Sequence, residues 1–117
     1  MEIKEIQDLQ KRFDMEYFKN FWEAEDEKSK IEKLQYLVVA LTGEIGEYAN
    51  IVKKISRDLT TLGINTLDER KNELTEELID CFIYIIITAN LLGMDLEKEY
   101  LKKMEKNKQR FQKYKKD

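Results

Sequence analysis

The chain has 117 residues, with 21 basic and 24 acidic side chains, no histidine, no proline and one cysteine. This length suits one domain over residues 1–117, and the many Lys, Glu, Leu and Ile residues favour helices. The lack of histidine excludes Ser-His and Cys-His nucleophiles and histidine-ligated zinc. Any metal must then be held mainly by oxygen, which favours Mg²⁺ or Mn²⁺.

Cys81 cannot form an internal disulfide, which fits a reducing compartment, and the polar start "MEIKEIQDLQ" is unlike a signal peptide. We therefore expect a cytoplasmic protein. The longest apolar run, residues 81–92, is too short to cross a bilayer, so no membrane partner is expected.

Hydrophobic periodicity predicts four helices and an all-α, four-helix-bundle-like fold. The first helix is expected from about Ile3 to Phe21. Its apolar side chains on or near one side are Ile6, Leu9, Phe13, Tyr17 and Phe18. The second is expected to begin near Ser29, where "SKIE" reads as a capping box with Glu32, and to end near Arg57.

Residues 58–66 are expected to form a loop that ends in a second cap, made by Thr66 and Glu69. The third helix should run to Leu92, because Gly93 is a natural stop. Asp95 should cap the fourth helix. The apolar stripe of that helix contains Tyr100, Met104, Phe111 and Tyr114.

The third helix is apolar nearly all round between Cys81 and Ile87. Burial against a second copy of the chain would explain this surplus, so that dimerisation completes the bundle. The alternative is a central helix that the other three wrap.

Two acidic pairs border the apolar stripes of consecutive helices. Glu44 and Glu47 form ExxE on the second helix, and Glu77 and Asp80 form ExxD on the third. Side chains three apart on a helix are neighbours, so each pair is locally repulsive. One or two Mg²⁺ ions would offset that repulsion. The alternative is ordinary solvated acids paired with Lys53, Lys54, Lys71 or the basic tail.

Residues 98–116 carry nine basic and two acidic side chains. On one flank, Lys103, Asn107 and Arg110 form a group suited to phosphate and sugar hydroxyls. The basic tail could instead be a solvated helix or a nucleic-acid arm. Because the flank of these three residues borders the apolar stripe, we expect a wall of an anion site and no nucleic-acid partner.

The segments "LTGEIGEYAN", "EELIDCFIYI" and "KMEKNKQRF", in this order, resemble the MazG-type all-α nucleotide pyrophosphohydrolases. The branch that includes dCTP pyrophosphatases looks closest. The similarity covers roughly residues 34–111. It rests on the ExxE…ExxD pattern, the tyrosine four residues after the last acid, and the K-x-x-x-N-x-x-R run.

The resemblance implies hydrolysis of a nucleoside triphosphate between the α and β phosphorus atoms, giving the monophosphate and pyrophosphate. It implies a MazG fold assembled as a homodimer or a dimer of dimers. It also implies a cofactor, Mg²⁺ with Mn²⁺ as a substitute. The matching metal ligands are Glu44, Glu47, Glu77 and Asp80. Tyr84, Lys103 and Asn107 match nucleotide-contacting positions, although Tyr84 also reads as a core aromatic residue.

Some relatives stack the base on an aromatic residue near the end of the ExxE helix, where this chain has "IVKKIS". Trp22 is the candidate to replace it, or else a packing residue. Lys54 could reach a phosphate or pair with Asp58. We expect Glu44 or Glu47 to activate the attacking water, with metal ions lowering the water's pKa. A non-catalytic helical dimer acting as a scaffold is the alternative function.

Overall fold

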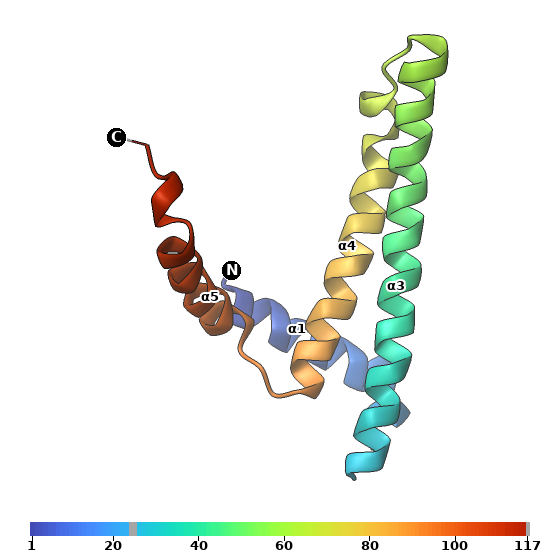
Figure 1. The fold of residues 1–117 in the computed structure, drawn as a ribbon. Helices are drawn as coiled ribbons and strands as arrows, with labels where there is room; N and C mark the ends of the chain where they lie inside the picture. The colour runs from blue at the N-terminus through green and yellow to red at the C-terminus, as the bar shows by residue number, and fades with distance from the viewer. Residues whose placement is uncertain (24–25, 117) are drawn as a thin grey trace.

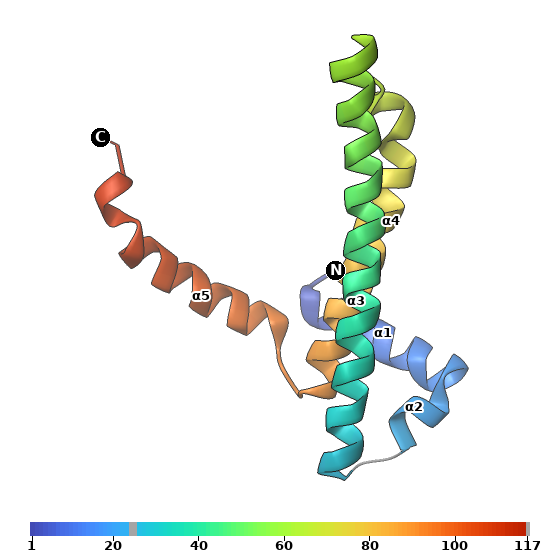
Figure 2. The same cartoon turned by 45° about the vertical axis from the view of Figure 1, so that its right-hand side comes forward.

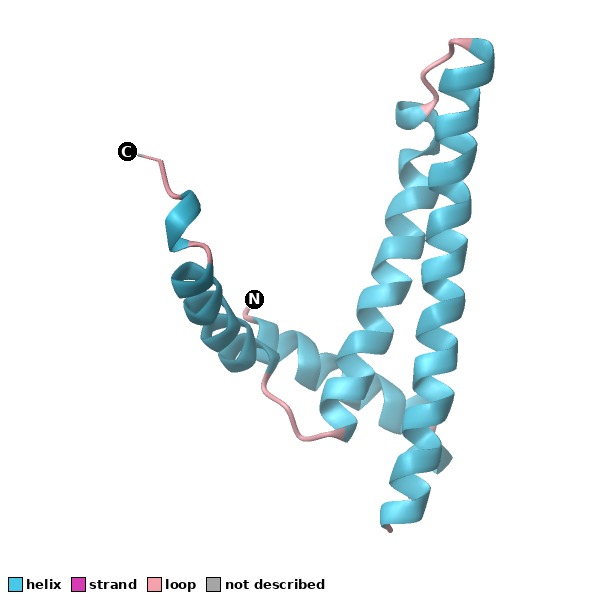
Figure 3. Ribbon diagram, in the orientation of Figure 1, coloured by secondary structure: helices cyan, strands magenta, loops and turns pink. Residues whose placement is uncertain are grey.

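The computed structural model describes residues 1–23 and 26–116. These residues form helices joined by short turns, with no strand among them (Figures 1 and 3), which confirms the all-α prediction. The longer helices are α1 (Ile3–Tyr17), α3 (Glu27–Arg57), α4 (Leu67–Leu91) and α5 (Leu96–Arg110). The short helical segments are α2 (Lys19–Glu23), η1 (Asp58–Leu62) and η2 (Gln112–Tyr114).

Helices α3 and α4 pack antiparallel along most of their length and form the centre of the fold (Figures 1 and 2). Their apolar side chains supply the buried hydrophobic residues, which are Leu37, Ile51, Cys81, Ile86 and Ala89. This pairing also brings the acidic segments of the two helices to the same level.

The start of α3 differs from the prediction. Asp26, and not Ser29, is its N-cap residue, because the Asp26 carboxylate accepts a hydrogen bond from the Ser29 amide at 2.7 Å. Ser29 thus lies in the first turn, and the predicted Ser29–Glu32 capping box is wrong. An ionised side chain three residues earlier satisfies the free amide, so the helix begins sooner. The predicted end at Arg57 is confirmed.

The connection between α3 and α4 is more ordered than the predicted loop. Residues 58–62 form a π-helical turn, which ends at Gly63 with φ +67°. Thr66 precedes α4 as predicted, but its hydroxyl donates to Asp58 Oδ2 at 2.9 Å instead of capping the helix. Arg70 Nη2 lies 3.6 Å from the same oxygen. The tertiary pairing of Asp58 thus displaces the predicted Thr66–Glu69 cap.

The buried side of α1 is polar, contrary to the apolar packing side we predicted. Gln7 and Asp14 are buried, whereas Leu9, Phe13 and Tyr17 are about half exposed or more. Gln7 Nε2 donates to the Met94 carbonyl at 2.8 Å, and Gln7 Oε1 accepts from a main-chain amide at the start of α5. Hydrogen bonding to the α4–α5 connection therefore sets the rotation of α1. The helix also ends at Tyr17 and not at Phe21.

Helix α5 begins as predicted, with Asp95 accepting a hydrogen bond from the Lys98 amide at 3.2 Å. It ends at Arg110, so Phe111 and Tyr114 lie beyond it. The helix leads away from α3 and α4 (Figure 2), and its apolar residues Tyr100 and Leu101 are exposed. The radius of gyration is 18.4 Å, whereas about 13 Å is typical of a compact chain of this length. The single chain is open.

Within the described residues, no single helix has both the length and the apolar character of a membrane span. The pair of α4 and α5 meets those criteria by length and composition only when it is taken together across its 101° bend.

Candidate active site

Three carboxylates converge between the two central helices. Glu44 projects from α3, and Glu77 and Asp80 project from α4 one turn apart. One oxygen from each of the three lies within 4.8 Å of the others, and each side chain is half-buried. We call these three residues the acid cluster. The antiparallel packing of α3 and α4 brings together the two acidic pairs that are far apart in the sequence.

Repulsion and burial both act on the acid cluster. Glu44 Oε2 and Glu77 Oε2 are shielded from solvent and have no hydrogen-bond partner. A hydrogen bond with Glu47, then burial and the neighbouring carboxylates, raise the pKa of Glu77 to about 7. Burial, followed by the charge of Glu47, raises the pKa of Glu44. These contributions come from burial and other acids and not from a cation, which argues against ordinary salt-bridged carboxylates.

Glu47, the fourth of the predicted acids, lies in a different position from the other three. Its side chain is exposed and lies outside the acid cluster, yet its hydrogen bond with Glu77 is the largest influence on the Glu77 pKa. Glu47 thus borders the acid cluster on the solvent side. A carboxylate in that position can accept a proton from water without being a ligand of the same ion.

The residues present fit a divalent cation. Three carboxylate oxygens at mutual distances under 4.8 Å can approach one ion, and hard oxygen donors are those that Mg²⁺ and Mn²⁺ take. Two of these carboxylates have shielded oxygens without a partner, which an ion would satisfy. The predicted ligands Glu44, Glu77 and Asp80 are therefore placed where one cation can reach all three.

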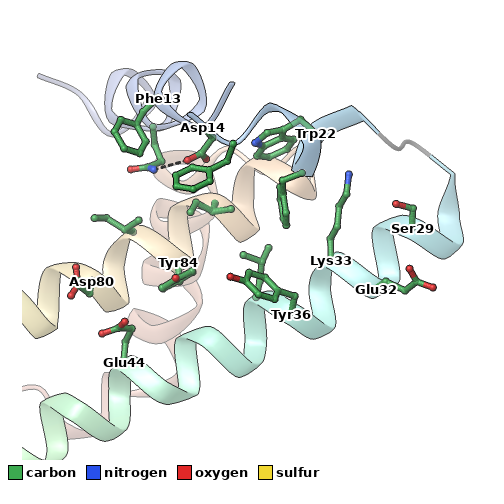
Figure 4. A pocket seen from close by; sticks show the side chains of 16 residues that line it. Phe13, Asp14, Trp22, Ser29, Glu32, Lys33, Tyr36, Glu44, Asp80 and Tyr84 are labelled. Carbon is green, nitrogen blue, oxygen red and sulfur yellow. Dashed lines mark hydrogen bonds between the residues drawn. The ribbon is translucent and has the colours of Figure 1, made fainter. Parts of the chain in front are cut away.

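A cavity of about 530 Å³ opens beside the acid cluster. Glu44 and Asp80 line one end of it, and residues of α1 and α2 line the other end (Figure 4). Its aromatic lining consists of Phe13, Phe18, Phe21, Trp22, Tyr36 and Tyr84. The volume falls within the range of small-ligand sites, and aromatic walls suit a planar heterocycle. We call this cavity the aromatic pocket.

Two predicted substrate residues, Trp22 and Tyr84, lie in the aromatic pocket. Burial raises the pKa of the Tyr84 phenol, so its hydroxyl stays protonated and can donate a hydrogen bond. Lys11 Nζ lies 4.3 Å from the Trp22 ring centroid. One face of the indole is therefore occupied by this ammonium group, and a base would have to use the other face or the edge.

Four aromatic residues of the pocket were not among the predicted site residues. Phe13 and Phe18 were predicted on or near the apolar side of the first helix, and Phe21 was named only as its end. Tyr36 was not singled out. A signal was present, because five of the twelve aromatic residues of the chain lie between residues 13 and 22. Asp14 was also missed, because nothing in its spacing along α1 indicates that it is buried.

The predicted residues of α5 are not brought to this site within one chain. Lys103, Asn107 and Arg110 lie on the helix that leads away from α3 and α4 (Figures 1 and 2). They are absent from the described lining of the aromatic pocket and from the acid cluster. Lys54 lies on α3 two turns beyond Glu47 and is half-buried. Asp58, the alternative partner of Lys54, is engaged by Thr66 and Arg70.

The fold and the site together define an all-α protein whose interhelical carboxylates, beside an aromatic pocket, could hold a cation. The family is shown by comparison: residues 32–114 match the MazG nucleotide pyrophosphohydrolase domain, so the chain belongs to the MazG family. The match contains the acid cluster and all of α5. It identifies the family and not a branch within it.

One similar curated protein is the "Gene 37 protein" of Mycobacterium phage L5, which is 44% identical over 64 residues. The aligned part is 55% of this chain and 54% of that protein, so the chain spans about half the length of the relative it matches. The name of that protein does not state an activity. No solved structure matches the chain.

Proposed function

We propose that this MazG domain is a Mg²⁺-dependent nucleoside triphosphate pyrophosphohydrolase, which converts a (d)NTP into the (d)NMP and pyrophosphate. One observation carries the proposal: Glu44 and Asp80 of the acid cluster line one end of a cavity that six aromatic residues also line. A nucleotide matches both ends of this cavity. Its planar base suits the aromatic side chains, and its phosphates, joined to the base through the sugar, suit a metal held by the carboxylates. Family membership supports the same substrate class.

The base would lie against the aromatic walls, and the phosphates would extend toward Glu44 and Asp80. Carboxylates repel phosphates, so this orientation requires divalent cations between them. Bound Mg²⁺ would neutralise the triphosphate and lower the pKa of a nearby water. Glu44, Glu77 and Asp80 would hold the metal. The proposed reaction is in-line attack of water on the α-phosphorus.

Glu47 is the better candidate than Glu44 for orienting and deprotonating that water. It is exposed and lies beside the acid cluster without belonging to it. Glu44, in contrast, belongs to the acid cluster and has one oxygen shielded from solvent. A metal ligand is less basic than a free carboxylate, since the ion competes for its electron pairs.

We further propose that the site is completed by a second copy of the chain, as a homodimer or a dimer of dimers. The support is the exposed apolar surface on three helices, which includes Val39, Ile79 and Leu101, together with the open shape. The flank of α5 formed by Lys103, Asn107 and Arg110 would then supply phosphate and sugar contacts to the acid cluster of the other copy. The triphosphate needs such a basic wall opposite the metal.

The test is product analysis with the common and damaged (d)NTPs in the presence of Mg²⁺, with dCTP first because of the sequence resemblance. Equal amounts of monophosphate and pyrophosphate support the proposal. Release of orthophosphate, or no product from any nucleotide, contradicts it. Glu76→Gln, which changes an exposed acid of α4 outside the acid cluster, is the control for Asp80→Asn.

The alternative function, a non-catalytic helical scaffold, rests on the same exposed apolar faces. A scaffold would form oligomers and yield no pyrophosphate. A nucleic-acid binder using α5 would also yield none, and its affinity for DNA or RNA would fall steeply with salt. Product analysis and salt titration therefore separate the three functions.

A further inference from the structure

Two shielded polar atoms without partners lie at the end of the aromatic pocket formed by α1 and α2. They are Asp14 Oδ2 and Trp22 Nε1. Figure 4 shows both side chains at this end, while Glu44 and Asp80 lie at the opposite end. Buried polar groups in folded proteins normally have partners, so two unsatisfied atoms in one cavity point to a ligand.

Asp14 is held in place by its own helix. Its side chain is 4% exposed. Gln10 Nε2 donates to Asp14 Oδ1 at 2.9 Å (the dashed line in Figure 4), and Oδ2 remains without a partner. Gln10 thus fixes the carboxyl group and leaves one oxygen for another donor. Because the residue also lines the pocket, this oxygen is the acceptor that Asp14 has left to offer to a ligand bound there.

The burial of Asp14 favours binding of a hydrogen-bond donor to its carboxyl group. Desolvation raises the Asp14 pKa, while the hydrogen bond from Gln10 and the charge of Lys11 act in the opposite direction. The ionised carboxyl group is therefore costly in the empty pocket. An N–H group that donates to Oδ2 would offset this cost, as would any bound donor that replaces the lost water.

The two ends of the pocket differ in what they can bind. The acid cluster end can bind phosphate only through cations. The Asp14 end carries aromatic side chains from α1 and α2, and a second anion there would face an acid. An uncharged heterocycle with an N–H donor beside an acceptor atom fits this end, because Asp14 Oδ2 accepts and Trp22 Nε1 donates.

We propose that Asp14 is a specificity-determining residue: its Oδ2 accepts a hydrogen bond from an N–H group on the edge of the nucleobase, and Trp22 Nε1 donates to an adjacent oxygen or ring nitrogen. The inference rests on the proposed function only for the identity of the ligand as a nucleotide. It assigns base selection to the buried face of α1.

Asp14→Asn is the informative variant. Asparagine keeps the shape of the side chain and an oxygen for Gln10, but replaces the free acceptor with an NH₂ donor. The preference among bases should therefore change and not merely weaken. We expect the ratio of kcat/KM between the best and the poorest of the four common nucleotides to shift by about tenfold or more. Asp14→Ala should bring the kcat/KM ratio between the best and the poorest nucleotide closer to one.

Asp8→Asn is the matched control, because Asp8 is exposed on the same helix and pairs with Lys4. It should keep the wild-type ratios. Equal losses for all four nucleotides in Asp14→Asn and Asp14→Ala would overturn the proposal, since a merely structural role predicts that result.

Binding gives a readout that does not depend on catalysis. Trp22 is the only tryptophan, so its fluorescence reports directly on the pocket. Nucleoside monophosphates added to the wild-type protein should change that fluorescence, with an order of affinity among bases that Asp14→Asn alters and Asp8→Asn does not. This order would support the inference even if no pyrophosphate were released. Hydrolysis with an unchanged order in Asp14→Asn would overturn the inference and leave the proposed function standing.

Discussion

Gln7 and Asn90 hold each other by two hydrogen bonds across 83 residues of sequence. Gln7 Nε2 donates to Asn90 Oδ1 at 3.1 Å, and Asn90 Nδ2 donates to the Gln7 main-chain carbonyl at 3.0 Å. Asn90 is near the end of α4, so the pair fixes α1 against that end. Asp14 follows two turns later on the same face of α1 and is thereby positioned in the aromatic pocket.

The first prediction concerns this pair. Asn90→Ala should destabilise the protein by about 1–3 kcal/mol, because it removes both hydrogen bonds between Asn90 and the buried Gln7, and Gln7 Nε2 keeps only its bond to the Met94 carbonyl. Nucleotide affinity should fall as well, since α1 carries one wall of the pocket. Thermal unfolding and Trp22 fluorescence titrations would measure both effects. Gln109→Ala, on the exposed surface of α5, should change neither.

The second prediction treats the acid cluster as one metal site. Glu44→Gln or Asp80→Asn should abolish turnover and weaken Mg²⁺ binding with the helical fold retained. Removing one charge should also raise the melting temperature in metal-free buffer, because repulsion is relieved. Calorimetric Mg²⁺ titration and circular dichroism provide the measurements. Near wild-type activity in both variants would refute a shared metal site.

The third prediction concerns pH. The folded protein raises the Glu77 pKa from 4.5 to about 7, so between these values it binds more protons than the unfolded chain. Metal-free stability should therefore fall as pH rises through this window and then level off. Mg²⁺ should oppose the fall. Unfolding curves from pH 4 to 8 should show a steeper decline for wild type than for Glu77→Gln; equal slopes would refute the assignment.

The fourth prediction concerns assembly. Sedimentation at low micromolar concentration should give at least twice the chain mass of 14.1 kDa. Val39 is 71% exposed on α3, so Val39→Glu should weaken the assembly if a second copy covers this face. Val39→Ala is the milder comparison. A clean wild-type monomer would contradict the proposed dimer and leave the apolar faces unexplained.

The fifth prediction concerns α5. Lys103→Ala and Asn107→Ala should each lower kcat/KM by about ten- to a hundredfold, the effect of one lost charge-assisted contact. Lys102→Ala and Lys113→Ala should barely matter. Equal losses in all four variants would indicate a diffuse electrostatic role.

A mixing experiment would show whether α5 serves the other copy. Glu44→Gln subunits are expected to be inactive alone, and Lys103→Ala subunits to have strongly reduced activity. When the two are unfolded and refolded together, the mixture should be more active than either variant alone. One site of the mixed dimer would then carry neither change. No recovery, despite proven exchange of subunits, would place both residues in the site of the same copy.

The sequence by itself determined the features that depend on neighbours along a helix. The ExxE and ExxD pairs, the end of α3 at Arg57 and the Asp95 cap all follow from spacings of three or four residues. The sequence also placed each acidic pair beside an apolar stripe, whereas the packing of α3 against α4 brought Glu44, Glu77 and Asp80 together. The all-α class followed from the same periodicity.

Tertiary structure decided what depends on distant partners. Gln7 and Asp14 are buried because Asn90 and the pocket lie against α1, and no spacing within α1 reveals either one. Thr66 binds Asp58 and not its own helix for the same reason. The direction of α5 depends on the α4–α5 connection. Helix formation depends on interactions between residues three or four apart in the sequence. The burial of a polar group depends instead on the distant partner that the tertiary fold brings to it.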